Sequence, residues 1–451
     1  MVTGLGLVCA LGDEVETAWR RMLRGEAVSE PIPDHWHDYA NYGSRFWAPL
    51  PELDYQASGL PPSDRLRFDR VTLNAIAATR QAICDAAMPM RAIGRKLDRF
   101  EIEHVDPTRI GVYMGTGIGG VETTLSSHAS QILERTRQQL DRLADEAGAL
   151  VLSGKIRGCA GRMHVPRRFN PLAVTMLMAN AISAAPAIRF GMKGPNRTIS
   201  LACASGTAAI GEAYQAIRRG DVDIAVCGGS EYLYDEYGSI FRAYDITGAL
   251  TRGFDHATAC NRPFDADRNG FLFSAGGAAV LVLESTHHAR RRGAPVKAEV
   301  LAFAESFDGH NLMAVEPSGA GFQRLIDKAL GDARLAPDEI AYINAHGTGT
   351  KQNDQVELEV LEALGFNNAV VNSTKGLIGH SIGASGAIEA LVTVLSLRDG
   401  RTHPCHNLDQ PIARLNFAAG ETRLAGGPAL SNSFAFGGHN CCLVLAKPDS
   451  S

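Results

Sequence analysis

One of the chain's nine cysteines, Cys203, has surroundings suited to a nucleophile. It lies in the segment SLACASGT, residues 200–207, between a predicted strand over 198–201 and a predicted helix over 208–218. A thiol at a helix N-terminus meets free backbone amides and the positive end of the helix dipole, which favour the thiolate. Because an arbitrary cysteine is far more often a small buried residue, Cys203 needs support from other side chains.

Two histidines provide that support. His346 lies in NAHGTGT, residues 344–350, and His380 ends STKGLIGH, residues 373–380. Both are expected at strand ends among glycines, where a histidine taken alone is more often a satisfied structural residue. Together with Cys203 they supply a nucleophile and two neutral imidazole donors for a developing oxyanion. The combination therefore favours a nucleophilic cysteine over three separate structural residues.

Three other patterns are better explained as structure. The segment GTGIGG at 115–120 fits a dinucleotide fingerprint, but a long polar helical stretch over 131–149 follows where that motif needs a short helix and a second strand. The segment GHSIG at 379–383 matches a hydrolase nucleophile elbow, yet no aspartate and histidine follow it in a convincing order. The pair His287-His288 beside three arginines indicates a solvated helix end, not a metal site.

Composition and charge narrow the class of protein. With 451 residues, 45% of them hydrophobic, the chain can bury a large core and is too apolar for a disordered protein. Its net charge of −5 gives no overall attraction to nucleic acid. Neither CxxC nor HExxH occurs, and no stretch resembles a signal peptide or a membrane span of about 20 apolar residues. These features predict a reduced cytoplasmic protein without metal or membrane anchor.

The order of expected elements indicates α/β layers with buried sheets. A buried strand opens the chain at 2–8, an irregular loop covers 35–62, and a helix follows over 67–87. Residues 125–168 are expected to form an inserted, charged, partly helical excursion. The C-terminal part then alternates helix 321–333, strand 340–345, helix 356–364, strand 369–373 and helix 384–398.

With these motifs in order along nearly its whole length, the chain resembles the elongating β-ketoacyl-acyl-carrier-protein synthases, a branch of the thiolase superfamily. The segments that carry the resemblance are VTGLG (2–6), GIGG (117–120), ACASG (202–206), RPFD (262–265), 344–350, 373–380 and NSFAFGG (432–438). The resemblance implies an α/β thiolase-like fold with five αβαβα layers and two pseudo-equivalent halves. The halves are expected at 1–248, with the nucleophile, and at 249–451, with the catalytic histidines.

The resemblance also implies the reaction. Cys203 would accept an acyl group, and His346 and His380 would bind the thioester carbonyl of a malonyl unit. Loss of carbon dioxide then gives an enolate that attacks the acyl group, while the amides of Cys203 and Phe436 form an oxyanion hole. No metal or organic cofactor is needed, because the phosphopantetheine arm is carried by the partner, an acyl carrier protein.

Further residues take roles by the same resemblance. Lys375 and Glu389 would form a buried pair that orients the histidines, Phe436 would be a gating aromatic, and Thr348 and Thr350 would hydrogen-bond the phosphopantetheine arm. Ile118 would line the acyl pocket, and the packing of Ile118, Tyr244 and Phe436 would determine the depth of that pocket. The candidates for contact with the acidic carrier protein are Arg65, Arg67 and Arg252.

Several positions depart from the family pattern. The string LFSAG at 272–276 lacks an expected acidic residue, the family's GGTN is GGHN at 437–440, and the 125–168 excursion is long. These departures leave open a fatty acid enzyme or a synthase of a specialised polyketide or polyene pathway, as a homodimer or as a heterodimer with a related subunit. Two alternatives remain: a chain-length-determining partner subunit, and a degradative thiolase that uses coenzyme A.

Overall fold

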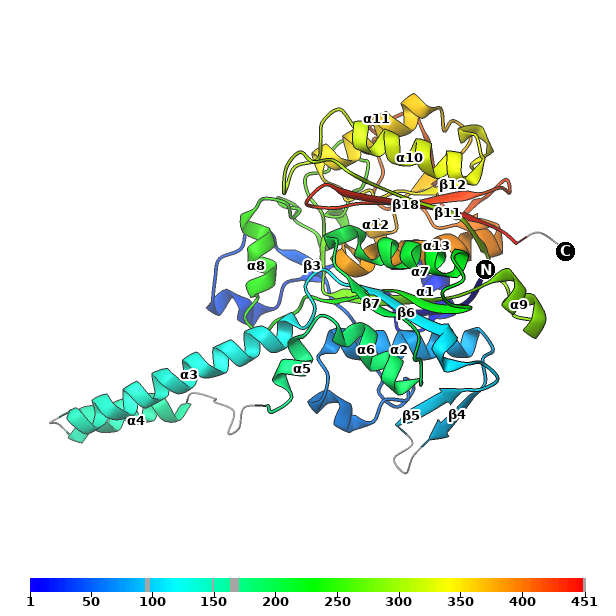
Figure 1. Cartoon of the computed structure of the whole chain (residues 1–451). Coiled ribbons are helices and arrows are strands. Elements are labelled where there is room, and N and C mark those ends of the chain that lie inside the picture. Colours follow the sequence, from blue (N-terminus) through cyan, green and yellow to red (C-terminus); the bar gives the residue numbers. More distant parts are fainter. Residues whose placement is uncertain (94–97, 148–149, 163–169, 449–451) are drawn as a thin grey trace.

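Two β-sheets and three layers of helices make up the body of the protein (Figure 1). The computed structural model describes residues 1–93, 98–147, 150–162 and 170–448. Helices α2 (Arg70–Asp85) and α6 (Ala181–Arg189) cover the outer face of the first sheet. Helices α7 (Ser205–Arg218) and α13 (Ser385–Asp399) lie between the sheets, and α10 (Ala320–Ala333) and α11 (Lys351–Leu364) cover the second. The expected five layers are confirmed.

The first sheet has the strand order β1-β10-β8-β6-β7. Its central strands are buried along their whole length because helices cover both faces. β10 is antiparallel to β1 and to β8, whereas β6 is parallel to β8 and to β7. The bounds are β1 (Val2–Val8), β6 (Ile110–Gly115), β7 (Asn196–Ile199), β8 (Ile224–Tyr232) and β10 (Gly276–Glu284).

The second sheet repeats this plan with the order β11-β18-β17-β12-β13-β15. Its strands are β11 (Glu299–Phe307), β12 (Tyr342–Asn344), β13 (Val370–Asn372), β15 (Asn416–Phe417), β17 (Ala429–Phe434) and β18 (His439–Ala446). The chain changes from one sheet to the other between Glu284 and Glu299, because β10 still belongs to the first sheet. The halves expected at 1–248 and 249–451 therefore divide the chain earlier than the sheets do.

The two central helices begin in the same unusual way. A 3-10 turn, Ala202–Ala204 before α7 and Ile382–Ala384 before α13, starts with a residue of positive φ, +45° at Ala202 and +44° at Ile382. Each turn leads into Ala-Ser-Gly, and the helices pack so closely there that a Cβ on Gly206 would lie 2.7 Å from the backbone nitrogen of Ala387. This short repeat of Ala-Ser-Gly lies where the two helix N-termini come together.

A helical hairpin, formed by α3 (Val121–Glu146) and α4 (Leu150–Arg162), projects from the body (Figure 1). It corresponds to the expected excursion at 125–168, although α3 begins four residues earlier and residues 148–149 and 163–169 lie outside the described part. The loop expected at 35–62 contains β3 (Phe46–Ala48), which joins a small sheet. The remaining helices include α1 (Val15–Leu23), α5 (Ala173–Leu177), α8 (Ser239–Ile246), α9 (Thr286–Arg292) and α12 (Lys375–Ile378).

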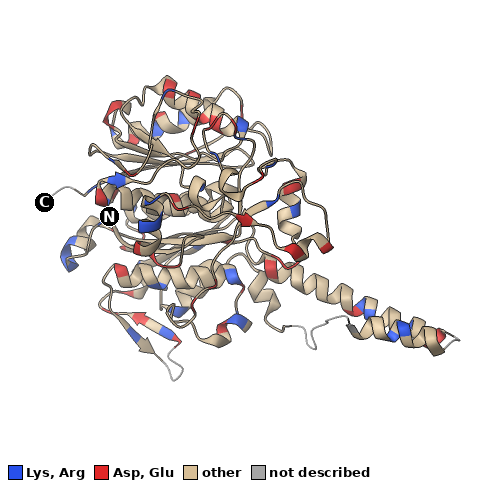
Figure 2. Ribbon diagram, turned by 180° about the vertical axis from the view of Figure 1, so that it is seen from behind, with Lys and Arg blue, Asp and Glu red and all other residues tan. Residues whose placement is uncertain are grey.

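Charged residues of both signs are interspersed over the outer helices, the loops and the hairpin, while the sheets and central helices are mostly uncharged (Figure 2). In the described part of the chain, none of the helices combines the length and the apolar character that crossing a membrane requires. Charges are therefore concentrated away from the interior, although some charged side chains are buried, among them Asp69, Glu284 and Lys375.

Candidate active site

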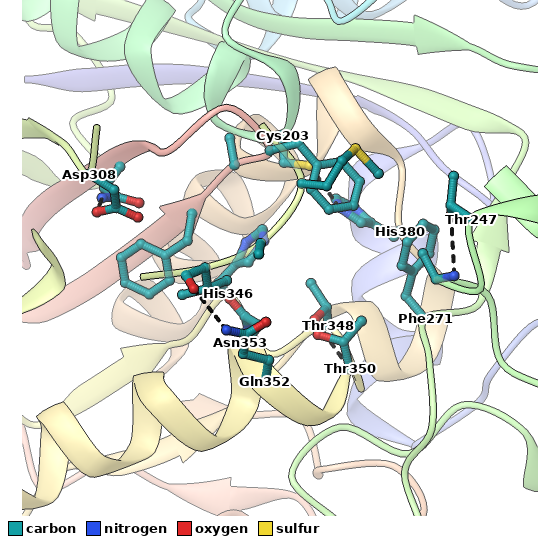
Figure 3. Close-up of a pocket in the computed structure, with 18 of the residues that line it drawn as sticks. Cys203, Thr247, Phe271, Asp308, His346, Thr348, Thr350, Gln352, Asn353 and His380 are labelled. Atoms are coloured by element: carbon teal, nitrogen blue, oxygen red, sulfur yellow. Dashed lines mark hydrogen bonds between the residues drawn. The ribbon is translucent and has the colours of Figure 1, made fainter. Parts of the chain in front are cut away.

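Cys203, His346 and His380 come together where the two central helices begin (Figure 3). One potential ligand atom from each lies within 4.8 Å of the others, and Sγ of Cys203 lies 3.0 Å from Nε2 of His380. The two imidazole rings are 5.6 Å apart between centroids and stand nearly perpendicular. Each of the three residues is at most 3% exposed. The structure thus joins residues that are far apart in the sequence into one buried cluster.

Cys203 is presented by the strained turn between β7 and α7. Ala202 has a left-handed backbone, which costs a non-glycine residue of order 1–3 kcal/mol unless its surroundings enforce it. Ser205 provides that enforcement, since its hydroxyl donates to the carbonyl of Ala202 at 2.7 Å and accepts from the amide of Leu201 at 2.9 Å. The nucleophile therefore sits on a turn whose shape is fixed by the first residue of α7.

His346 follows β12 in a loop that Glu357 of α11 holds. The Glu357 carboxylate accepts the backbone amides of His346 at 2.8 Å and Gly347 at 2.9 Å. Gly347 has φ +38°, and a Cβ there would lie 2.4 Å from the ring of Phe264, so only glycine fits. The glycine that follows His346 is therefore required for steric reasons.

His380 follows α12 and is fixed on both sides of its ring and along its backbone. Its amide donates to the carbonyl of Leu272 at 2.8 Å. Nδ1 lies 2.9 Å from the Ser385 hydroxyl, and the backbone amide of Ile382 donates to it at 3.3 Å. Because Nδ1 accepts this bond, the neutral ring carries its proton on Nε2, the nitrogen that faces Cys203.

Lys375 fixes the other ring in the same tautomer. Its Nζ lies 3.1 Å from Nδ1 of His346 and donates to the His346 carbonyl at 2.7 Å. An ammonium has only donors, so Nδ1 of His346 must accept and Nε2 must carry the proton. Lys375 also forms a buried ion pair with Glu389 of α13, as expected. Burial raises the pKa of Glu389 to about 7, and the Lys375 charge opposes that rise.

The pKa directions define the resting state of the site. Burial and the nearby Lys375 charge hold the pKa values of His346 and His380 well below the ordinary value, so both rings are neutral. Burial raises the pKa of the Cys203 thiol to about 11, although Lys375 and the amides of Phe436 and Cys203 lower it. The expected thiolate is therefore wrong for the resting residue, because burial outweighs the helix terminus and the cation.

The tautomers of the two rings also bear on metal binding by Cys203, His346 and His380. Coordination through Nε2 requires a lone pair there and the ring proton on Nδ1. Nδ1 of His346 faces the Lys375 ammonium, and Nδ1 of His380 accepts an amide hydrogen, so both rings favour the opposite tautomer. The cluster is suited to donate two hydrogen bonds to an anionic oxygen rather than to bind a cation.

A cavity of about 240 Å³ reaches Cys203 from the surface, and both histidines line it (Figure 3). Thr348 and Thr350 lie along it with their hydroxyls 2.9 Å apart, and Phe436 also contributes to the wall. Sequence reasoning did not single out several other lining residues, among them Thr247, Asp308, Met313, Gln352 and Asn353. The cavity is thus a largely apolar channel with hydroxyls placed along it.

The remaining predicted residues lie elsewhere. Ile118 is 45% exposed and Tyr244 packs against Phe271; neither lines the cavity. The three predicted carrier contacts do not line it either, and each already has a neighbour: Arg65 lies over the Tyr55 ring, Arg67 near Asp64 and Asp98, and Arg252 beside Asp245.

Three supporting residues escaped the sequence reasoning, namely Glu357, Ser385 and Glu231. Glu357 follows His346 by 11 residues, across a loop and the start of α11, and such a spacing has no chemical signature of its own. Ser385 could have been found by comparing the Ala-Ser-Gly segments that begin both central helices. Glu231 escaped because its hydrogen bonds join residues distant in the sequence, such as Gly383.

Comparison with known proteins agrees with this geometry. Residues 1–289 match the beta-ketoacyl synthase N-terminal domain family and residues 297–409 match the C-terminal domain family. The chain is 33% identical to 3-oxoacyl-[acyl-carrier-protein] synthase 2 of Synechocystis sp., over 99% of this chain and 97% of the relative. It is 32% identical to the Staphylococcus aureus protein of the same name, with 99% and 98% covered.

Solved structures give the same result. A beta-ketoacyl synthase from Burkholderia phymatum is similar with a TM-score of 0.79 and 28% identity, covering 99% of this chain and 98% of that one. The ishigamide ketosynthase/chain length factor has a TM-score of 0.76 at 27% identity with the same coverage. With both family domains in order, relatives along its full length and a buried cysteine between two histidine donors, the chain belongs to the beta-ketoacyl synthase family of acyltransferases.

Proposed function

We propose that the protein condenses a Cys203-bound acyl group with a malonyl unit carried on an acyl carrier protein, with loss of carbon dioxide. The observation that carries this proposal is the pair of neutral imidazoles at the buried thiol of Cys203. Nε2 of His380 lies 3.0 Å from Sγ, and one ligand atom of His346 lies within 4.8 Å of the other two residues. Such a pair stabilises an oxygen that becomes negative during reaction, and one donor of this kind is typically worth about 10²–10³ in rate.

The first half-reaction is acyl transfer. The sulfur of Cys203 attacks the carbonyl carbon of an acyl thioester, and the bond to the carrier's sulfur breaks. The proton of the Cys203 thiol is transferred to the departing phosphopantetheine sulfur, which leaves as a thiol. The amides of Cys203 and Phe436 lie against the reacting sulfur and are placed to stabilise the tetrahedral oxyanion. The Nε2–H of His380 favours negative charge on the sulfur as it develops.

The second half-reaction is decarboxylative condensation. The malonyl thioester oxygen accepts from Nε2–H of His346 and His380, the bond to the carboxylate breaks, and carbon dioxide leaves. The resulting enolate carbon attacks the acyl carbonyl, and the sulfur of Cys203 leaves and takes up a proton. Neutral rings are required for this role, and burial together with Lys375 keeps them neutral.

We also propose how the enzyme binds its carrier-bound substrate and how its subunits assemble. Thr348 and Thr350 would hydrogen-bond the phosphopantetheine arm in the channel, and the reaction needs no metal or organic cofactor of the enzyme's own. A homodimer or heterodimer in the cytoplasm remains part of the proposal. Dimer formation is supported by two features. Strand β7 lies at the edge of the first sheet, and the apolar side chains of Ile118, Leu177, Met178 and Ile188 on neighbouring elements are exposed.

The alternatives fit the site less well. A chain-length partner subunit does not need a nucleophile, whereas Cys203 is held on a strained turn beside a histidine donor. A thiolase needs a second cysteine as acid and base, and among the described residues that line the cavity Cys203 is the one cysteine. Cleavage of acetoacetyl-coenzyme A by the purified protein would support the thiolase alternative.

Intact-protein mass spectrometry tests the proposal. The wild type, Cys203→Ala and the control Cys84→Ala, which removes an exposed cysteine, are incubated with a panel of acyl-carrier-protein thioesters. We expect one acyl adduct on the wild type and on Cys84→Ala and none on Cys203→Ala, followed by loss of the adduct when malonyl carrier protein is added. Failure of every donor to acylate Cys203 would contradict the enzyme proposal and favour the partner subunit.

A further inference from the structure

Glu231 is a buried carboxylate at the end of β8 that connects the two halves of the site. It is fully buried, and four donors point at it. Gly117 and Gly383 donate backbone amides to Oε2 at 2.5 and 3.1 Å, while the Thr116 hydroxyl and the Ile118 amide donate to Oε1 at 3.1 and 3.3 Å. Residues 116–118 follow β6 in the first half, and Gly383 lies in the 3-10 turn before α13, the second central helix.

One group of contacts leads from Glu231 to the nucleophile. The loop after β6 that Glu231 holds accepts hydrogen bonds from both sides of the Cys203 turn. Ser200 donates to the Gly117 carbonyl at 3.2 Å, and the single hydroxyl proton of Ser205 is shared between the Ala202 carbonyl at 2.7 Å and the Thr116 carbonyl at 3.2 Å. Since Ser205 also fixes the strained Ala202 backbone, the position of this loop bears on the position of Sγ.

The other group leads to His380. Gly383 comes directly after Ile382, whose backbone is held at φ +44° and whose amide donates to Nδ1 of His380. A Cβ on Gly383 would lie 2.2 Å from the Gly117 nitrogen and 2.5 Å from Oε2 of Glu231, so the two loops meet at the carboxylate without spare room. Glu231 thereby contacts the turn that sets the tautomer and orientation of this ring.

We propose that Glu231 is a positioning residue that fixes the distance between Cys203 Sγ and His380 Nε2 by holding the loop after β6 against the turn before α13. Glu231 touches neither the thiol nor the ring, and it acts through backbone amides of both loops. This inference rests on the proposed function, because the rate it controls is that of acyl transfer to Cys203.

The test compares Glu231→Met, which keeps the volume but accepts no hydrogen bonds, with Glu231→Gln. Glutamine can place its carbonyl oxygen toward Gly117 and Gly383 and its amide toward Thr116 Oγ1, and so retains most of the contacts. We expect Glu231→Met to lower kcat for acylation of Cys203 at least 10-fold per folded enzyme, with KM for the acyl carrier protein thioester changed less than twofold. Glu231→Gln should stay within about threefold of wild type in kcat.

Asp69→Asn is the matched control, since Asp69 is also a buried carboxylate and accepts hydrogen bonds from Val71 and Thr123, away from the cavity. It should lower thermal stability and leave kcat per folded enzyme unchanged. If Glu231→Met does not fold, Glu231→Asp, which shortens the reach by one methylene, should show an intermediate loss of kcat.

Two results would overturn the positioning role. The first is a wild-type kcat in Glu231→Met, or in Glu231→Asp where the Met variant does not fold. The second is a loss of kcat in Glu231→Gln that is as large as the loss in Glu231→Met. A wild-type protein that forms no Cys203 adduct would instead overturn the proposed function.

Discussion

The ammonium of Lys375 lies 3.1 Å from Nδ1 of His346, and this contact decides which ring nitrogen carries the proton. Because Lys375 can only donate, the His346 proton is directed into the cavity on Nε2. The Ile382 amide, in the turn before α13, does the same for His380. Two unrelated donors therefore produce one result, a pair of N–H groups aimed at the space beside Cys203.

Loss of the lysine should affect both stability and chemistry. In Lys375→Met, Glu389 is left buried without its partner, and breaking such a pair typically destabilises a protein by about 3–5 kcal/mol. We expect a lower midpoint in denaturant unfolding and a condensation rate reduced by about 100-fold or more, since His346 can then adopt either tautomer. Adding Glu389→Gln to Lys375→Met should recover stability but not condensation.

The two histidines should separate the half-reactions. His380 contacts the thiol, whereas His346 contacts Lys375 and faces the cavity. His346→Ala should lower malonyl decarboxylation by about 10²–10³-fold and still allow the Cys203 adduct to form. His380→Ala should slow both steps. Equal effects of the two variants on adduct formation, measured by mass spectrometry over time, would contradict this division of roles.

The high pKa of Cys203 predicts how the unacylated thiol reacts with alkylating agents. A pKa of about 11 leaves about one thiol in 10⁴ ionised at pH 7, so alkylation by iodoacetamide should rise about tenfold per pH unit between pH 7 and 9. The exposed Cys84 provides the comparison within the same protein. A rate at Cys203 that is already constant above pH 7 would show that the resting residue is a thiolate.

The same shift affects stability against pH. The pKa of Cys203 is raised above the value of an unfolded cysteine, about 8.5. The folded state therefore holds this proton more tightly, and its contribution to stability is complete below about pH 8.5 and is lost as the pH rises toward 11. The free energy of unfolding of Cys203→Ala should decrease less than that of the wild type over that interval.

The sequence allowed the reactive residues to be identified, but it did not allow their protonation state to be predicted. Cys203, His346, His380 and Lys375 could be predicted because each lies in a motif with a recognisable order, and Glu389 followed from the family resemblance alone. The protonation of Cys203 could not, since burial depends on how the two central helices pack. Nor could the neighbours that already engage the three arginines expected to bind the carrier protein be seen from the sequence.

The strained turn beneath the nucleophile gives the last prediction. Ala202 has φ +45°, a conformation that glycine adopts freely, whereas Ala204 two residues later is right-handed at φ −89°. Ala202→Gly should therefore change the free energy of unfolding little, or raise it by up to about 1 kcal/mol, because relief of strain offsets the added chain entropy.

The control Ala204→Gly has no strain to relieve and should destabilise the protein by about 1 kcal/mol. If the turn also fixes Sγ against His380, Ala202→Gly should slow acylation of Cys203 several-fold despite its retained stability, because the freed backbone no longer holds the thiol at 3.0 Å from Nε2. Wild-type acylation in Ala202→Gly would mean that Ser205 and the surrounding loops alone position the nucleophile.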